Sequence, residues 1–321
     1  MLYLIRYSVF RFSKMSKIKK YIPGNLHTVS YEGLLAFYDN PRNFEVRDGR
    51  KEKFNLEFPE NTVVLLTHGN FEIDSCLFNS IDLSNNDYVR LIKNFSDFGT
   101  KKAIIASGIP ERFIIENQTS RLTGDANRST SADDFIRAKD FSGNKLLDNT
   151  SELQGEGEKK HKKYHDTISK KMKELEQKED GVIGFDIHDT GIRLMGEQKI
   201  SDTFRKEGFP LISLGTKDGD SCNDEILNYF AGRLEYHLGI RSHINDPYKG
   251  GYVTIKHGKN YREENNTRKR NLIQVELGRF LYLKESTQEI DTQRMEIIGE
   301  GLKRAMTETG HKFGKEYFNN L

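Results

Sequence analysis

The sequence predicts an α/β protein, a three-layer α/β/α sandwich built on a mixed, mostly parallel β-sheet. Short apolar runs with the composition of buried strands alternate along the chain with longer amphipathic segments. Neither an internal repeat nor a proline-rich linker interrupts this alternation. Strands that alternate with helices are typical of a sheet covered by helices on both faces.

The length of 321 residues suits one large α/β domain. We expect residues 1–60 to form an N-terminal extension with the first elements, and residues 61–321 to form a single domain. The 50 basic and 48 acidic residues nearly cancel and leave a formal net charge of +2. This balance gives no reason to expect nucleic acid as a partner.

The cysteines and the N-terminus indicate where the protein works. Cys76 and Cys222 have neither the spacing of a zinc site nor the density of a disulfide scaffold, so we expect a reducing, cytoplasmic environment. Arg6 and Arg11 interrupt the apolar N-terminus, and no run approaches the roughly 20 residues that span a bilayer. We therefore expect no membrane partner.

Six short runs rich in Val, Ile, Leu or Phe, most of them bounded by Gly, Asn, Pro or charged residues, predict buried strands. They cover residues 62–67, 102–107, 182–188, 210–215, 252–257 and 272–277.

Three amphipathic segments predict helices. In the first of them, Ile168, Met172 and Leu175 repeat at helical spacing within a Lys/Glu-rich stretch. Its first half, GEGEKKHKK, is charged and broken by glycine, so we expect a loop there. The three segments are residues 151–180, 224–239 and 286–309.

Two histidines follow predicted strands and point to a metal site. His68 directly follows the first strand, with Glu72 or Asp74 one turn later as a carboxylate ligand. His188 ends the strand 182–188 and shares a strand face with Asp186, a carboxylate placed to hold a metal-bound imidazole. The alternative is a pair of polar strand ends that only form hydrogen bonds.

Glu276 lies within the apolar run 272–277, where a carboxylate is costly unless it is paired or functional. It shares a strand face with Gln274. A carboxylate near a zinc ion is the usual general base for water activation. The alternative is the half-exposed alternation of an edge strand.

The segment SRLTGDANR carries two arginines, Arg121 and Arg128, with Asp125 and Asn127 between them. Guanidinium groups bind carboxylates with two hydrogen bonds, and an acidic neighbour can hold an arginine in place. The segment therefore predicts a clamp for a substrate carboxylate, with a solvated charge cluster as the alternative. The polar stretch 124–158 is expected to form an excursion beside the site.

Two more segments are candidates for the site. His165 is expected near the start of the long helix, facing the cleft, unless it belongs to an ordinary polar first turn. Asn245, Tyr248, Gly250 and Gly251 lie in a turn-rich loop, where the paired glycines permit a close approach to a ligand or form a simple tight turn.

Taken in order, these motifs resemble the N-formylglutamate amidohydrolase family from about residue 62 to residue 282. The resemblance implies an α/β/α fold similar to that of zinc carboxypeptidases. It implies one catalytic Zn²⁺ bound by His68, His188 and a carboxylate, with Glu72 favoured over Asp74.

The resemblance also implies a function: hydrolysis, by metal-activated water, of the amide bond of an N-acyl amino acid or a similar small carboxylate. It implies Glu276 as the general base, with Arg128 and His165 as further catalytic residues. It further implies that Arg128 stabilises the oxyanion and Arg121 binds the substrate carboxylate. Two acids, Asp74 and Asp189, depart from the family pattern. The alternatives are a zinc peptidase, a cell-wall amidase with a longer substrate, and an inactive binding protein; the sequence does not indicate an oligomeric state.

Overall fold

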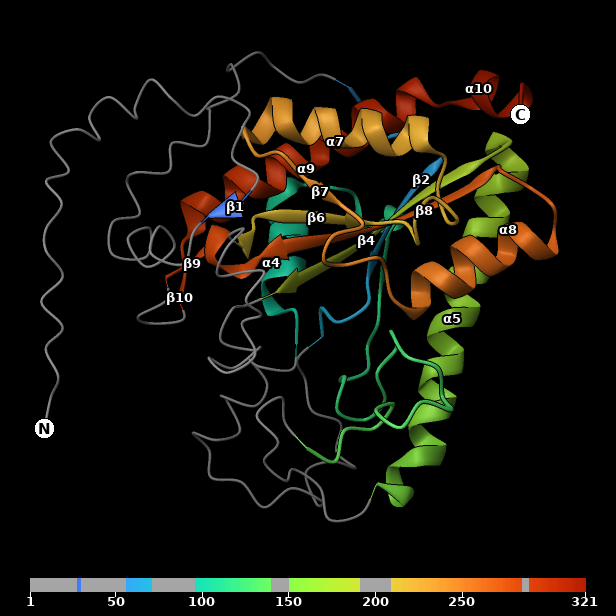
Figure 1. Cartoon of the computed structure of the whole chain (residues 1–321), viewed down its shortest axis with the longest axis vertical. Helices are drawn as coiled ribbons and strands as arrows, with labels where there is room; N and C mark the ends of the chain where they lie inside the picture. The colour runs from blue at the N-terminus through green and yellow to red at the C-terminus, as the bar shows by residue number, and fades with distance from the viewer. Residues whose placement is uncertain (1–27, 30–55, 71–95, 140–149, 191–208, 285–288) are drawn as a thin grey trace, which may run out of the picture.

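The computed structural model describes residues 28–29, 56–70, 96–139, 150–190, 209–284 and 289–321, and the fold is given for these residues. Its centre is a six-stranded sheet with the strand order β3-β2-β4-β8-β6-β7 (Figure 1). The strands are β2 Thr62–Leu66, β3 Ile114–Glu116, β4 Val182–Thr190, β6 Ile212–Gly215, β7 His243–Ile244 and β8 Arg270–Gly278.

The sheet is mixed but mostly parallel. Strands β3, β2, β4 and β8 run parallel, β6 is antiparallel to β8, and β7 is parallel to β6. The register places His188 of β4 directly beside Glu276 of β8. Because the carboxyl ends of parallel strands meet at one edge of the sheet, the polar strand ends lie together there.

Helices cover both faces of the sheet, as the sequence predicts (Figure 1). The side chains of β2 alternate between the two cores, because Val64 and Leu66 pack on one face while Val63 and Leu65 pack on the other. The helices on the first face are α4 Phe98–Ser107, α7 Asp224–Leu238 and α9 Thr292–Lys312, and those on the second are α5 Ser151–Glu179 and η5 Thr254–Asn260.

The remaining elements are short. They are β1 Thr28–Val29 paired with β5 Phe209–Pro210, β9 Leu283–Lys284 paired with β10 Glu289–Ile290, η3 Glu111–Phe113, η6 Arg279–Leu281, α8 Tyr261–Glu264 and α10 Lys315–Asn319. The predicted strand 210–215 is thus divided between β5 and β6, and the last long helix begins later than predicted. Across the described ranges no helix has the length and apolarity needed to cross a membrane.

The predicted strand 102–107 is wrong, because this run belongs to helix α4. Ala103, Ile104 and Ser107 are buried while Ile105 is 63% exposed, which is a helical and not a strand periodicity. Helix α9 approaches α4 so closely that a Cβ at Gly299 would lie 2.4 Å from the carbonyl oxygen of Ala103. Tertiary packing therefore favours a helix over the β-type composition.

The predicted strand 252–257 is also wrong, because helix η5 begins within it. The turn starts with the amide of Ile255, which donates to the carbonyl of Gly251. Before it, the amide of Val253 donates to the side-chain oxygen of Asn127. The fold thus supplies a cap from a distant loop, which the local sequence does not reveal.

Helix α5 begins at Ser151, so the loop expected in its first half is absent from the structure. Glycine serves close packing there, since a Cβ at Gly157 would lie 2.4 Å from the carbonyl oxygen of Thr123. The apolar face that the sequence predicts is present, with Ile168 and Met172 fully buried.

Candidate functional site

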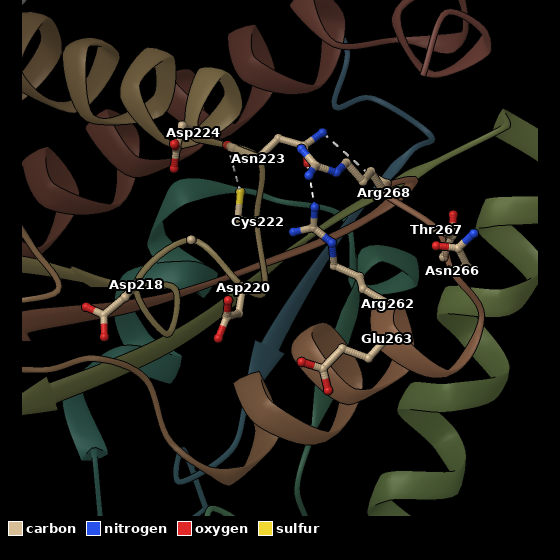
Figure 2. Close-up of a pocket in the computed structure, with 11 residues that line it drawn as sticks. Asp218, Asp220, Cys222, Asn223, Asp224, Arg262, Glu263, Asn266, Thr267 and Arg268 are labelled. Carbon is tan, nitrogen blue, oxygen red and sulfur yellow. Dashed lines mark hydrogen bonds between the residues drawn. The ribbon is translucent and has the colours of Figure 1, made fainter.

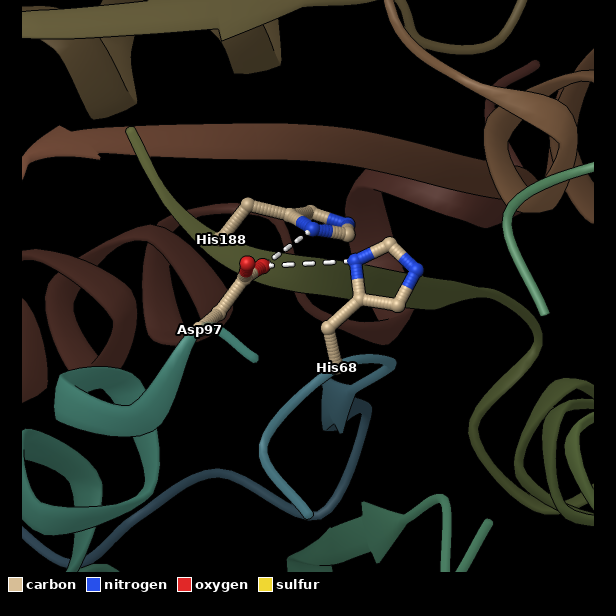
Figure 3. Close-up of side chains that lie close together, drawn as sticks. All are labelled: His68, Asp97 and His188. Atoms are coloured by element: carbon tan, nitrogen blue, oxygen red, sulfur yellow. Dashed lines mark hydrogen bonds and ion pairs between the residues drawn. The ribbon is translucent and has the colours of Figure 1, made fainter. Parts of the chain in front are cut away.

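Three buried side chains from separate elements meet at the carboxyl edge of the sheet (Figure 3). His68 follows β2, His188 lies near the end of β4, and Asp97 immediately precedes α4. Oδ2 of Asp97 lies 2.8 Å from Nδ1 of His188 and 3.4 Å from Nδ1 of His68. One ligand atom of each residue lies within 4.8 Å of the others, so the cluster can hold a metal ion.

Each histidine is held from behind by another carboxylate. Nε2 of His68 lies 2.8 Å from Asp125, and Nε2 of His188 lies 2.9 Å from Asp186. A carboxylate only accepts hydrogen bonds, so these Nε2 atoms carry the protons and the Nδ1 atoms face Asp97. Carboxylate-backed imidazoles are typical of metal ligands, because the carboxylate fixes the tautomer and the ring orientation.

The donor set fits a divalent metal ion, and one feature of the site supports this. Nδ1 of His68 is buried and has no hydrogen-bond partner among the described residues. A buried nitrogen without a partner is costly in a folded protein. A cation between Asp97, His68 and His188 would satisfy it, and two imidazoles with one carboxylate are a known zinc set.

The charged groups of the cluster change one another's pKa values. Burial acts to raise the pKa of Asp97, but His68 and His188 overcome it and hold that pKa below its usual range. Burial acts to lower the pKa of His188, but Asp186 and Asp97 raise it well above its usual value. A site that can stabilise an imidazolium between carboxylates can equally stabilise a cation in the same place.

Glu276 lies beside the cluster and is buried. Burial, with the charges of Asp97 and Asp189, raises its pKa to about 7, although His188 opposes the shift. Its Oε1 accepts a hydrogen bond of 2.7 Å from the Gln274 amide. A carboxyl group poised near neutrality is suited to proton transfer.

A hydrogen-bonded chain reaches Glu276 from the glycine loop. The Gly251 amide donates to Gln274 Oε1 at 2.6 Å, and Gln274 in turn donates to Glu276. A Cβ at Gly251 would lie 2.2 Å from the Asn127 amide group, so only glycine fits. The glycine therefore joins the loop 245–251 to the candidate general base.

The other residues of that loop have different surroundings. The Asn245 side chain accepts a hydrogen bond from the Thr216 amide at 2.7 Å, and Gly250 has a φ of 101°. The Tyr248 hydroxyl forms a 2.8 Å hydrogen bond with Thr190 at the end of β4. Burial and the nearby charge of Glu276 raise the pKa of Tyr248, so its hydroxyl remains protonated.

The two arginines of the SRLTGDANR segment separate in the structure. Arg121 donates to Asp125 at 2.7 Å, and its pKa is raised by Asp125, Asp97 and Glu276 against the effect of burial. Arg128 is more exposed and donates to Asp134 at 3.1 Å. The charges of Asp97 and Glu276 therefore act on Arg121, whereas Arg128 is paired with Asp134.

A third arginine, Arg137, joins this group, although no sequence motif points to it. It shares Asp134 with Arg128, donating to the same oxygen at 3.0 Å. Burial lowers its pKa, and the neighbouring charges of Arg121 and Arg128 lower it further. Arginines that repel one another favour a bound anion.

His165 lies in the middle of α5, not near its start, and is buried. Its Nε2 lies 3.0 Å from the carbonyl oxygen of Ala126, and its Nδ1 lies 2.7 Å from Nε2 of His257. Burial and the neighbouring His257 lower its pKa to about 2. Both ring nitrogens are therefore engaged within the protein.

The sequence does not identify Asp97 as a candidate ligand. Glu72 and Asp74, the carboxylates it named, lie outside the described residues. Asp97 precedes a run that reads as a strand but folds as α4, which hid its position at a helix start. The signal that could have found it is an aspartate directly before a helix, a typical N-cap residue.

Asp189, one of the two acids that depart from the family pattern, is buried and paired. Its Oδ1 accepts a hydrogen bond of 2.8 Å from Arg279, and its Oδ2 accepts one from Tyr282. Both of its carboxylate oxygens are therefore held inside the protein, although burial raises its pKa.

A separate cavity of about 440 Å³ lies by the amino end of β8, far along that strand from Glu276 (Figure 2). Its rim is charged, with Asp218 paired to Lys249 and Asp220 paired to Lys259. None of its lining residues belongs to the cluster around Asp97.

Two solved structures share this fold. An N-formylglutamate amidohydrolase from Ralstonia eutropha matches with a TM-score of 0.63 and 17% identity, over 83% of this chain and 96% of that one. A gene product from Agrobacterium tumefaciens matches with a TM-score of 0.56 and 16% identity, over 78% of this chain and 90% of that one.

The family comparison covers the segment that carries the site. No curated protein matches the chain. Residues 89–283 match the model of the family described as N-formylglutamate amidohydrolase, which confirms the resemblance seen in the sequence motifs. That match spans more than half of the sequence, so this chain belongs to the N-formylglutamate amidohydrolase family.

Proposed function

We propose that this protein is a zinc-dependent amidohydrolase that cleaves the amide bond of an N-acyl amino acid of the N-formyl type. The observation that supports this most is the buried cluster of His68, Asp97 and His188, in which each histidine is backed by its own carboxylate. The relative from Ralstonia eutropha is an N-formylglutamate amidohydrolase, which directs the choice of substrate.

His68, His188 and Asp97 hold the zinc ion in this proposal. When bound there, zinc lowers the pKa of water towards about 7 and polarises an amide carbonyl. Asp125 and Asp186 fix the tautomer and the orientation of the two imidazoles, since each accepts the proton of one Nε2.

Glu276 is the general base. Its carboxylate takes a proton from the attacking water and passes it to the leaving nitrogen. Gln274 holds one of its oxygens at 2.7 Å, which restricts the carboxylate to one orientation. The raised pKa makes this carboxylate a stronger base than an exposed glutamate.

The arginines recognise the substrate. Arg121, whose pKa is raised by the charges of Asp97 and Glu276, stabilises the oxyanion in this proposal. Arg128 and Arg137 share Asp134 and bind the substrate carboxylate. This pairing supports a substrate that carries a carboxylate.

The direct test uses the purified full chain, first stripped of metal and then reloaded with Zn²⁺. Zinc should restore hydrolysis of N-formylglutamate. Glu276→Gln protein, prepared in the same way, measures the background rate of hydrolysis. A panel with N-formylglutamine, N-acetylglutamate and short peptides defines the acyl and side-chain preference. Hydrolysis confined to peptides would favour a peptidase, and zinc-loaded protein inert on the whole panel would refute the proposed function.

A further inference from the structure

Two adjacent residues of α5, Tyr164 and His165, are buried against the site although neither belongs to the metal cluster. Both continue the buried helix face formed by Ile168 and Met172. Each begins a chain of contacts that ends on a different histidine of the cluster.

The route from Tyr164 runs through β2. Its hydroxyl lies 3.0 Å from Thr67 Oγ1, and the Thr67 hydroxyl donates to Asp186 at 2.5 Å. The Thr67 hydroxyl has only one proton, which it donates to Asp186. Tyr164 is therefore the donor in its hydrogen bond with Thr67. The other oxygen of Asp186 lies 2.9 Å from Nε2 of His188. Tyr164 thus fixes the carboxylate that fixes His188.

The route from His165 runs through the loop that follows Arg121. A carbonyl only accepts, so Nε2 of His165 donates to Ala126. Its Nδ1 then accepts from Nε2 of His257, which sets the tautomer. Ala126 adjoins Asp125, whose oxygen lies 2.8 Å from Nε2 of His68. His165 thus holds the backbone that presents Asp125.

A second histidine of α5 strengthens this hold on the loop. Nε2 of His161, one helical turn before His165, donates to the carbonyl of Arg128 at 3.0 Å. The close approach of α5 at Gly157 brings the helix against the start of the same loop. The loop is therefore attached to α5 on both sides of Asn127.

We propose that Tyr164 and His165 are positioning residues for the metal centre, each orienting one of its two histidines through one carboxylate. This inference rests on the proposed zinc site and adds to it the residues that preorganise it. Losing a carboxylate or its partner behind a metal-bound histidine typically weakens metal binding about 10- to 100-fold.

A positioning role also has its own pH signature. Burial lowers the pKa of His165 to about 2 and that of His257 to about 3, so both stay neutral at working pH. Burial, with the charge of Asp186, holds the pKa of Tyr164 well above its usual value. None of the three residues should contribute a limb to the pH profile of the enzyme.

The experiment compares Tyr164→Phe, His165→Asn and His165→Gln in the full chain. Zinc affinity of the metal-free protein is measured by competition with a chelator, beside its melting temperature. A glutamine amide reaches the position of Nε2 and keeps the donor to Ala126, whereas an asparagine amide reaches only the position of Nδ1. We expect about tenfold or greater loss of zinc affinity for Tyr164→Phe and His165→Asn, and affinity close to wild type for His165→Gln.

Tyr261→Phe is the matched control. The Tyr261 hydroxyl donates to Glu176 of α5 at 2.9 Å. The substitution therefore also removes one hydrogen bond to this helix, but away from the site. Zinc affinity should be unchanged in this variant. An equal loss in Tyr261→Phe and Tyr164→Phe would overturn the proposal, because the effect would then be global.

Three further results would also overturn the proposal, and they differ from one another. If wild type binds zinc and the folded Tyr164→Phe and His165→Asn proteins bind it equally well, the positioning role fails while the metal site stands. If wild type binds no zinc, the proposed function fails and this inference fails with it. If the pH profile of kcat/KM for wild type has an acid or basic limb that disappears in His165→Gln, the ionisation of His165 takes part in the reaction. His165 would then be a catalytic residue and not a positioning residue.

Discussion

Asp97 lies 2.8 Å from Nδ1 of His188, although the two residues are 91 positions apart in the chain. The contact joins the start of α4 to the end of β4. It places a carboxylate between two buried histidines, which is the arrangement from which the metal site is inferred.

Asp97→Asn should lose most of the bound zinc, because an amide oxygen is a far weaker ligand than a carboxylate. The measurement is zinc per protein after dialysis against a weak chelator. Glu72→Gln and Asp74→Asn, measured in parallel, test the carboxylates that the sequence favoured. Full zinc in Asp97→Asn together with loss in either of the others would move the carboxylate ligand to that residue.

His68→Ala and His188→Ala should each strip the metal and abolish activity, because a site with three protein ligands loses much of its affinity when one is removed. His243→Ala is a suitable control, since His243 is a partly exposed histidine of β7 outside the cluster. Metal content and the rate on the best substrate are measured on the same preparations. A mutant that keeps one zinc per chain would show that its histidine is not a ligand.

Arg128→Ala should weaken the use of substrates that carry a free carboxylate, while Arg121→Ala should slow all substrates. Loss of a charge-assisted hydrogen bond costs about 1.5–3 kcal/mol, or roughly 10- to 100-fold in kcat/KM. The measurement compares each variant on a carboxylate substrate and on its carboxamide. Equal losses on both substrates in Arg128→Ala would remove the carboxylate clamp from the proposal.

Asp189→Asn should destabilise the fold without removing zinc. Asp189 is buried and paired with Arg279, and breaking such a pair leaves an uncompensated buried charge at a cost of about 3–5 kcal/mol. Chemical denaturation gives the free energy of unfolding, and the zinc assay is run beside it. Lost zinc at unchanged stability would place Asp189 in the metal site instead.

The central strands and their polar ends could be predicted from sequence. Buried parallel strands are continuous apolar runs, so His68, His188 and Glu276 stand out where such runs end or are interrupted. Their meeting point follows from the topology, because parallel strands bring their carboxyl ends to one edge.

The rest of the site depends on contacts between distant segments. The run 102–107 has the composition of a strand, and only its packing on α9 makes it a helix and brings Asp97 into place. His165 was expected at a helix start because the charged, glycine-containing segment before it reads as a loop. The packing of Gly157 against the carbonyl of Thr123 keeps that segment helical, and no local sequence pattern indicates this contact.

The pH dependence of catalysis should follow Glu276. Its pKa is raised to about 7 by burial, so below that pH the carboxyl group is protonated and cannot accept a proton. A nearby bound cation would lower this value. The acid limb of kcat/KM should therefore fall between the ordinary glutamate value of 4.5 and about 7, with the rate rising as the pH rises.

Glu276→Gln isolates this role, because glutamine keeps the volume and the hydrogen bond from Gln274 but cannot take a proton. It should lower kcat by about 10²–10⁴-fold, the usual range for a lost general base, and the acid limb should disappear. Zinc content should be unchanged.

A carboxylate whose pKa is raised by folding destabilises the folded state as the pH rises through that pKa. The metal-free variant should therefore be at least as stable as wild type at pH 8. Lost zinc would make Glu276 a ligand, lost stability would make it structural, and normal turnover in the folded, zinc-loaded variant would exclude it as the base.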